Sequence, residues 1–216
     1  VPGAGPGEGE VIVSGDSVMS GYYKQGDATR ATLTPDGGLR TGDIGRIDED
    51  GYLYITGRAK ELYKLENGKY VAPVPLEESL SLSPYIAQVV VYGADKPHNV
   101  ALIVPDLPAI TQWAKANGVE AEGEALLREP KVLQLLEAEV DKANSAFKGY
   151  ERIQRFVVET EELNPQNGLL TQTLKLKRRV SNQKYADVLD SLYPSSESAP
   201  RASYIRELQP AAKTGS

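Results

Sequence analysis

The 216-residue sequence contains no cysteine and only one histidine, one methionine and one tryptophan. The absence of cysteine excludes disulfides, thiolate metal ligands and cysteine nucleophiles, and it permits a reducing compartment. The single histidine, His98, excludes a metal site built from several histidines of this chain. We therefore expect no resident metal site, and we expect His98 to lie in a surface loop.

Long apolar runs and an excess of basic residues are also missing. No run approaches the roughly 20 apolar residues of a spanning helix, and the start VPGAGPGEGE has no signal-peptide pattern. The formal net charge is -6, which argues against a general nucleic-acid binder because phosphate backbones require clustered Lys and Arg. The length and the 40% hydrophobic content predict a soluble globular chain with one or two domains.

The segment from Leu39 to Pro73 is the most densely patterned part of the sequence. Alternating apolar residues on both sides of Asp50-Gly51 predict two strands joined by a two-residue turn, because Asp-Gly tolerates the positive φ of such turns. This hairpin would bring Asp43, before the first strand, close to Arg58, after the second. The sequence therefore predicts a carboxylate and a guanidinium that flank one spot.

The remaining pattern predicts an α+β fold. A short strand at 10–14 and a connector at 28–33 precede the hairpin, and a second hairpin surrounds Glu66-Asn67-Gly68. Further strands are expected at 86–92, 100–104 and 153–158, and helices at 75–82, after Asp106, from Pro130 to near Gly149 and at 180–192. From Ser195 the composition shifts to that of a solvated tail.

Four short motifs carry a family resemblance. In chain order they are RTGD (40–43), GRAK (57–60), GKYVAP (68–73) and LTQTLKLKR (170–178). Their order and spacing closely resemble the C-terminal motifs of adenylate-forming enzymes, in particular long-chain fatty acyl-CoA synthetases. The resemblance covers about residues 8 to 193.

The resemblance implies a domain plan. Residues 1–59 would be the C-terminal piece of the large adenylating domain, a β-hairpin or partial β-barrel segment. Residues 60–193 would form the mobile C-terminal subdomain, with a mostly three-stranded sheet covered by helices, and 194–216 a flexible tail. Lys60 would be the hinge. Nothing resembles the Gly, Ser and Thr-rich phosphate loop of the large domain, so we expect a C-terminal fragment that is inactive in isolation.

Asp43 and Arg58 are the expected nucleotide ligands by this resemblance. The oxygens of a carboxylate can accept hydrogen bonds from both ribose hydroxyls, and a guanidinium fork suits phosphate or ribose oxygens. The alternative interpretation is a turn-capping aspartate and a surface arginine. Lys64, Asn67 and Gly68 would border the coenzyme A path, although a simple hairpin tip explains them equally well.

Lys175 is the expected catalytic residue. Acyl-adenylate formation brings an anionic carboxylate to an anionic phosphate, and an ammonium that contacts both offsets their repulsion. The alternative is that the basic run at 175–179 is a solvated helix face. The motif departs from the family at Gln172, in place of a common proline, and at Leu174, in place of glycine in many relatives. Lys177 therefore remains the alternative register.

The resemblance implies an ATP-dependent acyl-CoA synthetase, an acid–thiol ligase that acts on a fatty acid. ATP, Mg²⁺ and coenzyme A would take part, and the other partner would be the missing N-terminal domain of the same enzyme, in the cytoplasm or peripherally at a membrane. Within the enzyme class, the alternatives are an adenylation domain that loads a carrier protein or belongs to a carboxylic acid reductase. From another class, the alternative is a non-catalytic binding module.

Overall fold

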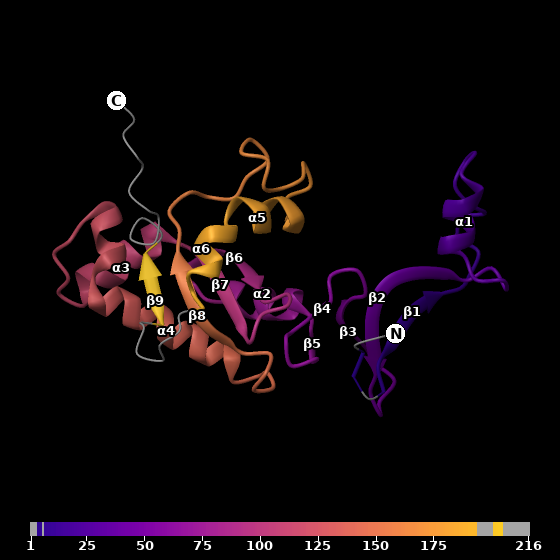
Figure 1. Ribbon diagram of the computed structural model, residues 1–216, viewed down its shortest axis with the longest axis horizontal. Coiled ribbons are helices and arrows are strands. Elements are labelled where there is room, and N and C mark those ends of the chain that lie inside the picture. The colour runs from indigo at the N-terminus through magenta and orange to yellow at the C-terminus, as the bar shows by residue number, and fades with distance from the viewer. Residues whose placement is uncertain (1–3, 6, 194–200, 205–216) are drawn as a thin grey trace. The chain divides into compact units, whose positions relative to one another are not determined.

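The computed structural model describes residues 4–5, 7–193 and 201–204 and has a mixed α+β fold (Figure 1). The chain divides into two compact units. The first unit comprises residues 1–64 and 68–75, and the second comprises residues 65–67 and 76–216. Each unit has its own sheet, and the two are described separately below.

The larger of the two sheets in the first unit is three-stranded and antiparallel. Its order is β1 (Gly9–Val13), β2 (Leu39–Ile47) and β3 (Leu53–Arg58), with the helix α1 (Gly26–Thr32) between β1 and β2. The predicted partial barrel is not present in the described part of the chain, because β1 and β3 remain the two edges of an open sheet. The predicted connector at 28–33 was also wrong, since α1 occupies most of it.

The β2–β3 hairpin confirms the predicted strand pairing but has a wider turn than predicted. The last paired residues are Ile47 and Leu53, and the amide of Asp48 donates to the carbonyl oxygen of Tyr52. The Asp48 carboxylate accepts hydrogen bonds from the amides of Asp50 and Tyr52. These side-chain bonds replace the close ladder contacts of a two-residue turn, so the loop accommodates Glu49, Asp50 and Gly51.

The second predicted hairpin is confirmed. Strands β4 (Tyr63–Lys64) and β5 (Tyr70–Val71) pair antiparallel, and Gly68 in their turn has a φ of 84°. Helix α2 (Pro73–Ser81) follows. No sheet in the described ranges combines strands from both sides of Lys60. The hinge role of Lys60 concerns motion and stays a prediction.

A four-stranded sheet organises the second unit. Its order is β6 (Ile86–Tyr92), β7 (Asn99–Pro105), β8 (Ile153–Val158) and β9 (Ala202–Tyr204). β6 and β7 are antiparallel, whereas β7, β8 and β9 run parallel. Every residue of β7 is buried, which fits its continuous apolar sequence, because a central strand covered on both faces needs no polar alternation.

β9 corrects two predictions, since the sheet was expected to have mostly three strands and residues 194–216 were expected to be a flexible tail. The amide of Phe156 in β8 donates to the carbonyl of Arg201, and Ala202 is buried. Arg201 also makes a two-pronged ion pair with Asp141. Composition could not reveal this strand because it is short and contributes one small buried side chain. The tail prediction for residues 194–200 and 205–216 lies outside the described residues.

Helices cover both faces of this sheet (Figure 1). α3 (Leu107–Ala116), the 3-10 helix η1 (Gly123–Arg128) and α4 (Pro130–Asn144) follow β7, and α3 and α4 lie on one side. α5 (Arg178–Lys184) and α6 (Ala186–Asp190) lie on the other side. The predicted apolar stripe of α4 is confirmed, because Val132, Leu136 and Val140 are fully buried.

The helix predicted at 180–192 is instead two short helices. The chain turns at Tyr185, which ends α5 and precedes α6 with φ -103° and ψ 11°. The Tyr185 side chain, only 3% exposed, lies in the same core as the two leucines that follow it, Leu189 and Leu192. Tyr185, Leu189 and Leu192 follow the i, i+4, i+7 spacing of one helix face, so the periodicity that predicted a helix here correctly predicted their shared burial, although it did not predict the break at Tyr185.

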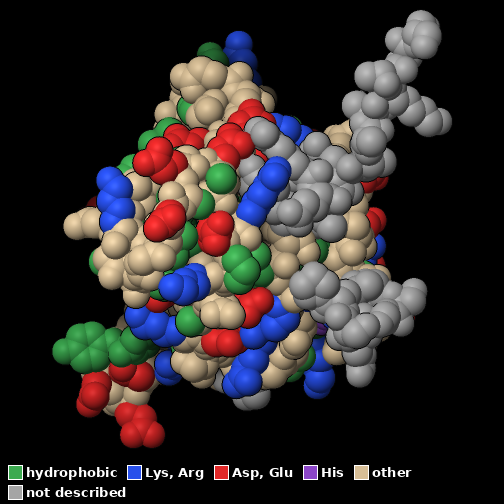
Figure 2. Space-filling view, turned by 90° about the vertical axis from the view of Figure 1, so that its left-hand side faces the viewer, with side chains coloured by type: hydrophobic (Ala, Val, Ile, Leu, Met, Phe, Trp, Pro, Cys, Tyr) green, Lys and Arg blue, Asp and Glu red, His purple; other side chains and the backbone are tan. Residues whose placement is uncertain are grey.

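Lys and Arg side chains alternate with Asp and Glu on the face of the molecule shown in Figure 2. Mixed charge of this kind is typical of a solvated surface. Among the described residues, no helix is both long enough and apolar enough to cross a membrane.

Candidate functional site

Asp43 and Arg58 lie side by side, as the sequence predicts, but they belong to the paired strands and do not precede and follow them. They are register partners in the β2–β3 ladder, and Nε of Arg58 lies 2.8 Å from Oδ1 of Asp43. The register of β2 and β3 alone fixes this proximity, because it places Asp43 directly opposite Arg58. The hairpin therefore holds a carboxylate and a guanidinium together at its open end, opposite the turn.

The residues before Asp43 fix the orientation of its backbone. The Thr41 hydroxyl donates to the carbonyl of Val11 in β1 and accepts the amide hydrogen of Asp43. Gly42 has a φ of 75°, a conformation that favours glycine, and its carbonyl accepts the amide of Ala59. Each residue of the Thr-Gly-Asp motif thus has a structural task that presents the carboxylate.

Gly57 links two of the motifs through packing. A Cβ atom at this position would lie 2.9 Å from the Cβ of Ala72, a distance that side-chain carbons do not tolerate. Gly57 is buried, and the adjacent Arg58 points outward with a side chain 55% exposed. The Gly-Arg pair therefore combines close packing against Ala72 with presentation of a cation.

The Asp43–Arg58 pair has the chemistry of a nucleotide contact. Asp43 is 26% exposed, so its carboxylate is partly reachable from solvent. A carboxylate can accept hydrogen bonds from vicinal hydroxyls, and the guanidinium can donate to phosphate or ribose oxygens. The opposite charges also hold one another in place before a ligand binds, although an ion pair this exposed adds little stability.

The residues predicted to serve the hinge and the coenzyme A path lie in two turns. Lys60 is exposed in the turn after β3, where the amides of Glu61 and Leu62 both donate to the carbonyl of Arg58. Lys64 is the exposed last residue of β4, and Asn67 and Gly68 lie in the turn after it. These positions agree with both predicted interpretations, a ligand path and a hairpin tip.

Lys175 lies at the closing end of a tight turn. The amide of Thr171 donates to the carbonyl of Lys175, while the amide of Lys175 donates to the Thr171 hydroxyl. Leu170 and Leu176 pair as an antiparallel bridge across the turn. Leu174 has a φ of 59°, in the left-handed region. The turn thus presents the exposed Lys175 side chain from a hydrogen-bonded base.

The basic run at 175–179 does not behave as one solvated face. Lys175, Lys177 and Arg179 are exposed, whereas the guanidinium of Arg178 points inward and makes two 2.7 Å contacts with the carboxylate of Glu77. Sequence reasoning missed this pair because Glu77 lies far upstream, in α2. A run of like charges gives no sign of which member is buried.

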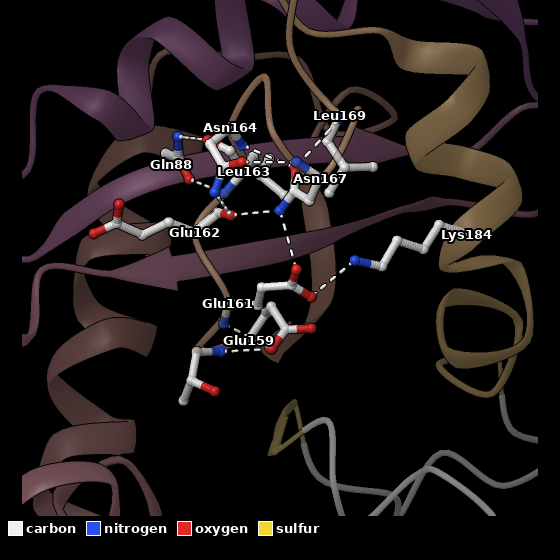
Figure 3. Close-up of polar contacts among 10 residues, drawn as sticks. Gln88, Glu159, Glu161, Glu162, Leu163, Asn164, Asn167, Leu169 and Lys184 are labelled. Atoms are coloured by element: carbon white, nitrogen blue, oxygen red, sulfur yellow. Dashed lines mark hydrogen bonds and ion pairs between the residues drawn. The ribbon is translucent and has the colours of Figure 1, made fainter.

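A polar network holds the chain that leads to the Lys175 turn (Figure 3). The Gln88 side chain in β6 both donates to the carbonyl of Leu163 and accepts its amide hydrogen. Asn164 and Asn167 each accept the backbone amide of the other. The Asn167 side chain also donates to the Glu161 carboxylate at 3.0 Å. The segment before the turn is therefore held by side chains and not only by its backbone.

Two acidic residues complete this network. Lys184 in α5 lies 2.8 Å from the Glu161 carboxylate and, together with Asn167, holds the pKa of that carboxyl below its usual range. Glu159 is buried, and its carboxylate accepts the amides of Thr160 and Glu161. Burial, assisted by the negative charge of Glu159, raises the pKa of the Tyr185 hydroxyl, so this tyrosine stays neutral at physiological pH.

The structure brings together some of the predicted site residues. Asp43 and Arg58 form one pair in the first unit, and Lys175 belongs to the second unit. Within the described ranges, no group of three His, Asp or Glu side chains could hold a metal ion.

Comparison with known proteins identifies relatives of the chain. A family model for the AMP-binding enzyme C-terminal domain matches residues 61–197. The chain is 39% identical over 188 residues to long-chain-fatty-acid–CoA ligase FadD15 of Mycobacterium tuberculosis, covering 86% of this chain and 31% of that protein. It is 35% identical to human long-chain-fatty-acid–CoA ligase 1, covering 88% of this chain and 28% of that protein. The chain therefore spans about a third of the length of these relatives.

Solved structures agree with this relationship. The adenylation domain of a carboxylate reductase from Mycobacterium chelonae has a TM-score of 0.69 and 28% identity, over 86% of this chain and 28% of that chain. The corresponding domain from Segniliparus rugosus, solved with AMP and a co-purified carboxylic acid, has a TM-score of 0.68 and 26% identity over the same shares. The matched family model, the fold and these relatives together show that the chain belongs to the family of AMP-binding enzyme C-terminal domains.

Proposed function

We propose that the chain is the C-terminal part of an ATP-dependent acyl-CoA synthetase that acts on a medium or long fatty acid. The observation that carries the proposal is the Asp43–Arg58 pair, held at 2.8 Å by strand register at the open end of a hairpin. The two curated relatives are both named long-chain-fatty-acid–CoA ligases, which supports the choice of acid and acceptor.

The proposed reaction has two steps. A carboxylate oxygen of the fatty acid attacks the α-phosphorus of ATP, and the bond to pyrophosphate breaks to give acyl-AMP. The thiol sulfur of coenzyme A then attacks the acyl carbon, loses its proton, and releases AMP. Both steps concentrate negative charge near phosphate, so donors fixed in position lower their barriers.

Asp43, Arg58 and Lys175 have separate roles in this proposal. Asp43 accepts hydrogen bonds from the ribose hydroxyls, and Arg58 donates to ribose or phosphate oxygens. Lys175 donates to the carboxylate and the phosphate while acyl-AMP forms, offsetting their repulsion. Lys177 is exposed next to it and remains the alternative for that role.

Further parts of the proposal rest on the resemblance alone. Lys60 would be the hinge between the two half-reactions, and Lys64, Asn67 and Gly68 would border the path of coenzyme A. The missing N-terminal domain would complete the site, in a cytoplasmic enzyme with or without peripheral contact with a membrane. Mg²⁺ would accompany ATP, but the described residues supply no metal cluster, so no step is assigned to a metal ligand of this chain.

The adenylation part of a carboxylic acid reductase is the second candidate. Two of the similar solved structures are adenylation domains of such enzymes. This enzyme would share the first step, but the acyl group would pass to the thiol of a carrier domain. Release of free acyl-CoA by the full-length protein would favour the synthetase, and its absence would favour the reductase or a carrier-loading enzyme. A full-length protein that forms no acyl-AMP would favour the non-catalytic binding module.

Lys175→Ala in the full-length enzyme tests the proposal. Loss of a charge-stabilising donor costs about 100- to 1,000-fold in rate, and this loss should appear in acyl-AMP formation. Thioester formation from supplied acyl-AMP bypasses that step and should stay within about tenfold of wild type. Lys177→Ala is the matched control for register. Equal loss in both half-reactions of the Lys175 variant would remove its assigned role.

A further inference from the structure

The Lys175 turn is attached on both of its sides to a single strand, β6. Gln88 and Val91 are the attachment points in that strand, and the connections use backbone atoms and partly buried side chains. The two attachments come from segments on opposite sides of Lys175 in the sequence, at Leu163 and at Arg178. Such an arrangement can fix both the position and the direction of the turn.

The attachment before the turn is reciprocal. Gln88 Nε2 donates to the carbonyl of Leu163 at 2.8 Å, and Gln88 Oε1 accepts its amide at 2.6 Å (Figure 3). One side-chain amide thus pairs with one residue much as a neighbouring strand would. Leu163 is itself buried in the core below.

The attachment after the turn is ionic. Arg178 Nη1 and Nη2 donate to Oε1 and Oε2 of Glu77 at 2.7 Å each, a fork-to-fork pair. Glu77 Oε1 also accepts the amide of Val91, and Arg178 Nη1 donates to the carbonyl of Val91 at 3.3 Å. The pair therefore closes a ring of contacts around one residue of β6, and it lies three positions after Lys175.

Because this ion pair is largely shielded from water, its attraction adds little net stability, which suggests a role in fixing position. The Arg178 and Glu77 side chains are only 19% and 13% exposed. Removing two charges from water offsets most of the energy that their attraction gains, and apolar replacements of buried ion pairs are often as stable. Directional, two-pronged geometry is what an ion pair provides and apolar packing does not.

We propose that Glu77 and Arg178 are positioning residues for Lys175, which hold the turn against β6 so that its ammonium meets the reacting groups in acyl-AMP formation. This inference rests on the proposed function of Lys175. Displacement of a catalytic group by about 1 Å can cost on the order of 100-fold in rate. Because Arg178 lies only three positions after Lys175, loss of its ion pair with Glu77 is expected to slow catalysis strongly.

The test uses the full-length enzyme and three variants. Arg178→Lys keeps the charge but loses the fork. Glu77→Gln with Arg178→Met removes both charges, while the amide oxygen introduced by the first substitution can still accept the amide hydrogen of Val91. Arg179→Met makes the same chemical change at the exposed neighbour and is the matched control. Acyl-AMP formation, thioester formation from supplied acyl-AMP and the thermal unfolding midpoint are measured for each.

We expect the rate constant of acyl-AMP formation to fall about 10- to 100-fold in the double variant and about tenfold in Arg178→Lys, because the turn loses its fixed direction. Thioester formation from acyl-AMP should stay within about threefold, a change of less than ~1 kcal/mol in barrier. The unfolding midpoint of the double variant should stay near wild type, and Arg179→Met should match wild type in every measurement.

Wild-type acyl-AMP formation in the double variant, or equal loss of both half-reactions in Arg178→Lys, would overturn the inference. If the double variant unfolds, Arg178→Lys alone decides between these outcomes. Lys175→Ala in the same assay separates this inference from the proposed function. If Lys175→Ala leaves acyl-AMP formation intact, the proposed role of Lys175 fails. If it abolishes that step while the Arg178 variants do not affect it, only the positioning inference fails.

Discussion

At the scale of single residues, Leu174 in the LTQTLKLKR motif has a backbone conformation that usually belongs to glycine. Many members of the resembled family have glycine here, and Leu174 has a φ of 59° with its side chain 69% exposed. The left-handed conformation costs a residue with a Cβ about 1 to 2 kcal/mol, whereas glycine adopts it freely. The turn therefore places a residue with a Cβ in a conformation that suits glycine.

We expect Leu174→Gly to raise the free energy of unfolding by about 0.5 to 1 kcal/mol, because relief of strain exceeds the greater freedom of glycine in the unfolded chain. Denaturant unfolding measures the change. Leu174→Ala is the control, since it removes the exposed side chain but keeps the Cβ. If alanine stabilised the chain as much as glycine, backbone strain would not be the cause.

His98 lies in the loop between β6 and β7, as the sequence predicts, but it is half-buried and not on the surface. Its ring lies 5.0 Å from that of Tyr193, and the Tyr193 hydroxyl donates to the His98 carbonyl. Burial, with a smaller effect of the Arg155 charge, lowers the pKa of His98 below its ordinary value. The loop location was predictable, but the contact with Tyr193 was not, because it joins residues far apart in the chain.

The lowered pKa of His98 predicts an acid-sensitive stability. Below about pH 6.5 the imidazole of His98 binds a proton in the unfolded chain but not yet in the folded chain. The contribution of His98 to the free energy of unfolding is therefore fully present above that pH and is lost as the pH falls below it. We expect His98→Phe, which keeps an aromatic ring against Tyr193, to have a smaller loss of unfolding free energy between about pH 7 and pH 5. An identical pH dependence in the two proteins would contradict this assignment.

At the scale of elements, strong periodicity made most of the fold predictable. The β2–β3 hairpin, the two buried strands β6 and β7, and the stripe of α4 all have clear patterns, and the hairpin also predicted the meeting of Asp43 and Arg58. The predictions failed where long-range contacts decide the structure. The strand β9 and the Glu77–Arg178 pair both depend on partners that local sequence does not reveal.

β9 gives a prediction at this scale. A chain that ends at residue 200 loses the Arg201 carbonyl that accepts the Phe156 amide, and the ion pair of Arg201 with Asp141. We expect faster hydrogen exchange at Phe156 and a free energy of unfolding lower by about 1 to 2 kcal/mol, since each such bond contributes about 1 kcal/mol. A chain that ends at residue 204 is the control. Equal exchange at Phe156 in both chains would show that β9 does not protect β8.

At the scale of the whole molecule, the division into two units matters for the proposed reaction. Asp43 and Arg58 belong to one unit and Lys175 to the other, so catalysis that uses all three depends on how the enzyme arranges the two. The sequence could suggest Lys60 as the pivot only through resemblance, because a change in φ and ψ leaves no mark on composition or periodicity.

Lys60→Pro tests the pivot in the full-length enzyme. Proline fixes φ near about -65° and should impede rotation between the half-reactions. We expect acyl-AMP formation to survive and transfer to coenzyme A to be lost. Lys60→Ala removes the same side chain without restricting φ and should retain both steps. If the proline variant performs both steps at the rate of the alanine variant, Lys60 is not the pivot.

The position of β9 also has a consequence for the order in which the protein is made. A ribosome releases β8 well before residues 202–204, which form its outer neighbour in the sheet. Until those residues emerge, one side of β8 presents unpaired amides and carbonyls, and such an edge can pair with another nascent chain. The short strand β9 can therefore cover this edge of β8 only after the whole connection between the two strands has been translated.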